Sequence, residues 1–124
     1  MRVFEGLDVG GPAVFQNDVY IYGNLRGFAG LSMPYKAVTG AYTATESDFV
    51  INATSGTFTV TLPTAVGIEG RIYVIKNSGA GTVTLDGNGS ETIDGGTTVS
   101  LSSQYQSVII QSNGANWTIL SEIA

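Results

Sequence analysis

From residue 42 to residue 120 the chain alternates between short apolar segments and turn residues, and this pattern restricts the folds that it can adopt. Residues 57–62 alternate strictly, with Phe58, Val60 and Leu62 on one side and threonines on the other. A period of two residues is typical of a half-buried strand. Further strands are predicted at 42–45, 49–53, 71–76, 82–86, 91–93, 97–101, 106–111 and 117–120.

Glycine-containing turns separate these segments. They fall at 55–56, 78–79, 88–89, 95–96 and 113–114. The last is Asn113-Gly114, a strong hairpin signal between two strands. Short strands at a spacing of about eight to twelve residues predict an antiparallel β-sandwich, jelly-roll-like in arrangement.

The chain lacks both cysteine and histidine. Disulfides and thiolate metal sites are therefore excluded, and the commonest general base and metal ligand is missing. The usual serine or cysteine triads also need a histidine. We therefore expect a protein that is not an enzyme and that holds no cofactor and no metal.

Charge is sparse, with five basic and ten acidic residues and a net charge of −5. Nucleic-acid binding needs clustered cations, so no nucleic-acid partner is expected. No apolar run of about twenty residues is present, and the first residues lack the apolar core of a signal peptide. We expect no membrane partner and synthesis in the cytoplasm.

Charge and composition divide the chain near Gly40 into an arm, residues 1–40, and a sandwich domain, residues 41–124. The arm is neutral, since three basic and three acidic residues cancel, and it carries half of the aromatic residues. Within it, residues 19–22 (VYIY) predict a strand with two apolar faces. An arm of this size makes too small a core by itself, so it is expected to dock on other surfaces. The residues predicted to dock are Phe4, Phe15, Val19, Tyr20, Ile21, Tyr22, Leu25, Phe28 and Tyr35.

Three other features invite a functional interpretation. Residues 86–91 (DGNGSE) with Asp94 are similar to a calcium loop, although a solvated hairpin explains them as well. Glu69, Glu91 and Asp94 could form a glycosidase carboxylate pair, but scattered surface acids are the simpler interpretation. Trp117 with Tyr105 could stack on a sugar, although a lone tryptophan on an alternating strand is more often core.

Several segments between 42 and 120 together resemble a module of phage virion proteins, found in tail fibres, tail spikes and small head proteins. They are 42–45 (YTAT), 49–51 (FVI), 60–63 (VTLP), 70–77 (GRIYVIKN), 83–85 (VTL), 91–95 (ETIDG), 105–108 (YQSV) and 112–117 (SNGANW). The resemblance covers about two thirds of the chain. It implies a structural protein of the particle and supplies no catalytic residues.

The arm adds a second resemblance. Residues 17–25 (NDVYIYGNL) look like an element common in trimeric fibre stalks. That resemblance implies a homotrimer.

These resemblances lead us to expect a capsid decoration, or cement, protein on the outside of a phage head. It would be made in the host cytoplasm and would bridge subunits of the major capsid protein through the arm, for instance by strand addition. The alternatives are a tail fibre or baseplate component, or a receptor-binding tip of the tail.

Overall fold

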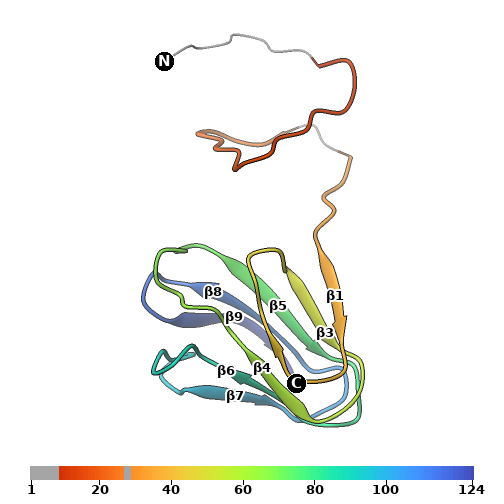
Figure 1. Ribbon diagram of the computed structural model, residues 1–124, viewed down its shortest axis with the longest axis vertical. Coiled ribbons are helices and arrows are strands. Elements are labelled where there is room, and N and C mark those ends of the chain that lie inside the picture. Colours follow the sequence, from red (N-terminus) through yellow and green to blue (C-terminus); the bar gives the residue numbers. More distant parts are fainter. Residues whose placement is uncertain (1–8, 27–28) are drawn as a thin grey trace. The chain divides into compact units, whose positions relative to one another are not determined.

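The computed structural model describes residues 9–26 and 29–124 (Figure 1). The chain divides into two compact units between Leu31 and Ser32. We call the first unit, residues 1–31, the arm, and the second unit, residues 32–124, the sandwich. Residues 35–38, which the sequence analysis assigns to the arm, pair with a strand of the sandwich.

The sandwich consists of two sheets, which Figure 1 shows as two layers. The five-stranded sheet has the order β1-β3-β5-β8-β9, and the four-stranded sheet has the order β2-β4-β6-β7. The strands are β1 (Tyr35–Val38), β2 (Tyr42–Thr43), β3 (Val50–Ala53), β4 (Phe58–Thr61), β5 (Ile72–Asn77), β6 (Val83–Asp86), β7 (Thr98–Leu101), β8 (Ser107–Ser112) and β9 (Trp117–Ile123). The described residues form no helix, and so none that could cross a membrane. The all-β, sandwich-like fold predicted from the sequence is confirmed.

From β1 to β6 the chain passes back and forth between the two sheets. β1, β3 and β5 are parallel neighbours in one sheet, and β2, β4 and β6 are parallel neighbours in the other. Each successive pair of strands therefore stacks on the pair before it, as repeats do in a solenoid. Antiparallel pairing begins with β7, β8 and β9, which end the stack.

The sheets are therefore mixed, and the fully antiparallel arrangement predicted from the sequence is wrong. A jelly roll, which is built from antiparallel strands, is not confirmed. The turn at Ser55-Gly56 illustrates the difference. This turn closes no hairpin; it carries the chain from β3 in one sheet to β4 in the other.

The core lies between the two sheets, and it is formed by the alternate side chains of each strand that point inward. Ile51, Ile75 and Val108 are fully buried neighbours on three adjacent strands of the five-stranded sheet. Full burial of such an aliphatic side chain stabilises the fold by about 1.5–3 kcal/mol. The rings of Tyr73 and Trp117 pack at a tilt, with centroids 5.7 Å apart.

The hairpin predicted at Asn113-Gly114 is confirmed. It joins β8 to β9, which pair antiparallel. The backbone N–H of Asn113 donates to the carbonyl oxygen of Asn116 at 3.0 Å. Gly114 has a φ of +93°, a conformation that glycine adopts without steric cost.

Candidate functional site

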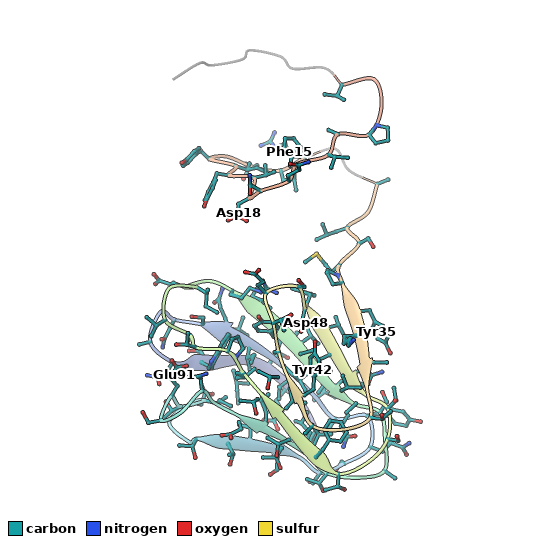
Figure 2. All side chains as sticks on the ribbon, viewed as in Figure 1. Phe15, Asp18, Tyr35, Tyr42, Asp48 and Glu91 are labelled. Atoms are coloured by element: carbon teal, nitrogen blue, oxygen red, sulfur yellow. The ribbon has the colours of Figure 1, made fainter. Side chains whose placement is uncertain are left out.

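The residues predicted to dock expose their side chains where the structure describes them. Tyr22 is fully exposed, and the exposed fraction is 75% for Tyr20 and 66% for Phe15. Val19, Ile21 and Leu25 are each more than half exposed. Figure 2 labels Phe15 and Asp18 within the arm. Side chains of this kind are normally buried in a folded domain, so their exposure makes this segment a candidate interaction surface.

Residues 9–26 of the arm form no helix or strand. The predicted strand at 19–22 does not form in the described residues, which instead run without strand pairing between bends at 16–17 and 22–23. One local contact is a weak hydrogen bond of 3.5 Å from the Tyr20 hydroxyl to the Asp18 carboxylate. An isolated apolar strand cannot satisfy its backbone groups without a second strand.

The remaining predicted docking residues lie elsewhere. Phe4 and Phe28 fall outside the described residues. Tyr35 belongs to the sandwich, where it begins the edge strand β1 (Figure 2). Its hydroxyl accepts a hydrogen bond of 2.9 Å from the side-chain amide of Asn52 on β3. The structure thus places Tyr35 in a different unit from the other docking residues.

The outer faces of the two sheets differ sharply in chemistry. On the four-stranded sheet, the residues opposite the core are polar, and the strand register aligns them in rows. They are Thr43, Thr59, Thr61, Thr84, Asp86, Thr98 and Ser100. On the five-stranded sheet, Tyr35, Val50, Val74 and Ile109 occupy one row across four adjacent strands. We call these four residues the apolar row.

The sequence contains a signal for this row. Residues 72–75 (IYVI) are apolar without interruption, whereas residues 57–62 alternate with threonine. An uninterrupted apolar strand is expected where both faces of a sheet are covered. Tyr73 and Ile75 face the core, so Ile72 and Val74 lie on the outer face of the sheet.

A polar cluster that sequence analysis missed holds residues 45–48 against the rest of the sandwich. The Asp48 carboxylate is almost fully buried and accepts hydrogen bonds from the Tyr42 hydroxyl at 2.7 Å and the Thr45 backbone N–H at 2.9 Å (Figure 2). The Arg71 guanidinium donates to the carbonyl oxygens of Asp48 and of Glu46.

This cluster shifts the pKa values of its members. Burial raises the pKa of Asp48, but the hydrogen bonds from Thr45 and Tyr42 outweigh burial, so the pKa is lowered overall. The hydrogen bond to Asp48 raises the pKa of the Tyr42 hydroxyl. The local hydrogen-bond donors favour the charged form of this carboxylate, and their hydrogen bonds to it stabilise the loop of residues 45–48.

Two acidic residues shared by the calcium and glycosidase hypotheses, Glu91 and Asp94, have hydrogen-bond partners within the sandwich. The Glu91 carboxylate accepts from the Thr64 hydroxyl at 2.5 Å and from the Ala65 backbone N–H at 2.8 Å. Asp94 accepts from the backbone N–H of Ile119 at 3.1 Å. In the described part of the chain, His, Cys, Asp and Glu residues do not gather in groups of three or more.

The sugar-stacking hypothesis is wrong for Trp117, because its side chain is only 1% exposed and packs in the core. Tyr105 is 59% exposed and adopts a positive φ of 68°. Its ring lies 5.7 Å from the Lys76 ammonium, which also donates to the Tyr105 carbonyl oxygen at 2.6 Å.

A shallow hollow of about 340 Å³ lies beside the β8–β9 hairpin. Glu69, Gln111 and Thr118 are among its lining residues, so Glu69 borders the hollow while Glu91 and Asp94 are absent from its lining. A second hollow of about 210 Å³ includes Arg71 and Tyr73. The first hollow is at the small end of the size range of pockets that bury a small ligand, and the second is below that range.

No family model matches the chain, and no curated protein is similar to it.

Proposed function

We propose that this chain is a structural protein of a phage particle, without enzymatic activity, that decorates the outside of the head and stabilises the shell. Its partner would be the major capsid protein, and its arm would be the element that docks. The observation that carries this proposal is the exposure of the large apolar side chains of the arm between Val14 and Leu25.

Physical magnitudes support docking by the arm. Aromatic side chains bury about 150–250 Å² each at an interface, and apolar burial contributes roughly 25 cal/mol per Å². Phe15, Tyr20 and Tyr22 together would therefore contribute on the order of 10 kcal/mol before the cost of ordering the chain. Ordering the backbone costs about 1–2 kcal/mol per residue, so the arm needs most of these contacts to bind firmly.

The sandwich would contribute in a different way. Its four-stranded sheet turns a threonine-rich face outward, which suits a surface that stays in water. Bound copies would bridge neighbouring capsid subunits and add contacts that only the expanded shell offers. The assignment to the head rests on the resemblance to small head proteins of phages.

A tail location is the alternative, as a fibre or baseplate component or as a receptor-binding tip. One observation favours it. Tyr105 is an exposed aromatic residue on the loop between β7 and β8, and the contact with Lys76 holds it in place. An exposed and positioned aromatic side chain is common at recognition surfaces.

Counting copies on purified particles separates the two locations. Quantitative mass spectrometry should find hundreds of copies per particle if the chain decorates the head, whereas a handful of copies would place it on the tail. Turnover of a polysaccharide by the purified chain would contradict the structural role altogether.

Rebinding to undecorated heads tests the arm. The Tyr22→Asp variant should bind far fewer copies than wild type, because a charge would enter an apolar contact. The matched control is Thr59→Asp, which puts the same charge on the polar outer face of the four-stranded sheet and should bind normally. Equal binding by both variants would show that the arm does not dock.

A further inference from the structure

The apolar row is a continuous feature of the outer face of the five-stranded sheet. Tyr35 pairs with Val50, Val50 with Val74, and Val74 with Ile109, so the four side chains are neighbours across four strands. Tyr35 is 62% exposed and Ile109 is 37% exposed, while Val50 and Val74 are half-buried between them. A single exposed apolar residue is ordinary, but a row that crosses a sheet marks an interaction surface.

The strands of this face carry almost no charge, and Glu69 lies at its margin, beside Gln111 and Thr118. Among the outward positions of the five strands, Lys76 is the one charged residue, and its ammonium donates to the carbonyl oxygen of Tyr105 at the margin. Glu122 on β9 pairs with the inward residue Val108 and accepts a hydrogen bond from the Gln106 amide. Outward carboxylates are thus lacking on these five described strands.

This distribution of charge indicates which partner fits. The chain has a net charge of −5, so two copies repel each other when they approach by an acidic surface. The outer face of the five-stranded sheet avoids that repulsion and buries apolar side chains at the same time. A second copy of the chain can therefore pack here at little electrostatic cost.

The β1 edge of the sheet is a less suitable site for self-association than its face. Lys36 on the edge strand β1 pairs with the buried Ile51, so its side chain lies on the inward row. Its ammonium is 5.8 Å from the centre of the Tyr42 ring. An inward charge on an edge strand hinders the addition of another strand.

The size of the face sets the expected strength. Five strands spaced about 4.8 Å apart and about 20 Å long present roughly 400–500 Å². A standard stable interface takes about 800 Å² from each partner, so this smaller face supports weak, reversible association. On a crowded particle surface the high local concentration would favour such a contact.

We propose that the outer face of the five-stranded sheet is a self-association surface, on which a second copy of this chain packs against the apolar row. This inference is independent of the proposed function, since it holds for a location on the head or on the tail.

Sedimentation equilibrium of the full chain, from about 1 to about 200 µM, tests the inference. Wild type should associate reversibly, and Ile109→Glu should weaken association at least about tenfold because the interface would bury a carboxylate. Thr84→Glu is the matched control, because it adds the same charge to a central strand of the opposite outer face. It should associate like wild type.

Circular dichroism and thermal unfolding check that each variant folds. If Ile109→Glu fails to fold, Tyr35→Glu makes the same test at a more exposed position. A wild type that stays monomeric throughout the range would overturn the inference. So would outward-face variants that associate as strongly as wild type, which would assign association to the arm. Loss of head binding by Ile109→Glu with a monomeric wild type would assign the face to the capsid instead.

Discussion

The hydroxyl of Tyr42 donates a hydrogen bond of 2.7 Å to the buried carboxylate of Asp48, six residues further along the chain. Tyr42 begins the edge strand of the four-stranded sheet, and Asp48 precedes β3 of the other sheet. This contact therefore ties together the two sheets where the stack of strands begins. Because the charged carboxylate of Asp48 holds this short loop, the stability of this end of the sandwich depends on pH.

We expect stability to fall in acid partly through Asp48. Its pKa is lowered in the folded chain, so the folded state binds fewer protons than the unfolded state. The stabilisation is complete above the unfolded pKa of about 3.9 and is lost as the pH falls toward the folded pKa. Urea unfolding at about pH 6 and about pH 3 measures this loss.

The Asp48→Asn variant should be less stable at neutral pH by about 1–3 kcal/mol and should lose less stability in acid. Asp86→Asn serves as the control, because Asp86 faces outward on β6. If Asp48→Asn loses as much stability in acid as wild type, another group causes the acid sensitivity.

A second prediction concerns Asn77, whose side chain is fully buried at the end of β5. Its amide donates to the carbonyl oxygens of Gly81 at 2.7 Å and Leu101 at 2.9 Å, and its oxygen accepts from the Gly79 N–H at 3.2 Å. Asn77→Ala leaves these backbone groups without partners and should destabilise the fold by about 2–4 kcal/mol.

Urea unfolding measures the effect of Asn77→Ala, with Thr59→Ala, a half-buried position on the outer face of β4, as the control. The control should change stability by less than about 0.5 kcal/mol. Similar values for the two variants would mean that water replaces the hydrogen bonds of Asn77.

A third prediction rests on the close approach of two glycines. A Cβ atom added at Gly81 would lie 2.1 Å from the carbonyl oxygen of Gly56, so the backbone would have to move. We expect Gly81→Ala to lower the free energy of unfolding by about 2 kcal/mol or more. Thermal unfolding should show no such loss for Gly40→Ala, where an added Cβ meets nothing within 4 Å.

A fourth prediction addresses the arm. Tyr20 and Tyr22 are exposed and lie outside any strand, whereas Tyr73 is buried in β5. Chymotrypsin should therefore cleave the free chain first after Phe15, Tyr20 or Tyr22, because proteases attack exposed backbone without regular structure. Mass spectrometry of the early fragments identifies the sites.

On decorated particles the same sites should be protected if the arm docks on the shell. Cleavage at equal rates in the free and the bound chain would contradict docking by the arm. Cleavage that begins within the sandwich would show that the sandwich opens before the arm is attacked.

Several features of the fold could be predicted from local sequence. Strands were expected at 57–62 and 71–76, and β4 and β5 occupy those positions to within one residue. Alternation and turn residues are local signals, so they locate strands and identify the face that is buried. The short strand β1 escaped prediction, because Lys36 interrupts a four-residue segment without regular alternation.

The candidate site was predictable in part. Exposure of the described arm residues agrees with the aromatic crowding of that segment, but the apolar row on the sandwich was not foreseen. Its members come from β1, β3, β5 and β8, which are far apart in sequence. The local pattern shows that β5 is apolar on its outer face at Val74, but only the strand register shows which residues lie beside Val74.

The sequence by itself therefore determined that the chain is all-β, where most of its strands lie, and that an aromatic arm precedes them. Only the tertiary structure decided which strands pair and in which direction. Ser55-Gly56 and Asn113-Gly114 have similar turn chemistry, yet the first leads into the opposite sheet and the second closes a hairpin. The reason is that strand pairing depends on contacts between distant segments. The inward apolar residues are buried whether a turn closes a hairpin or leads into the opposite sheet.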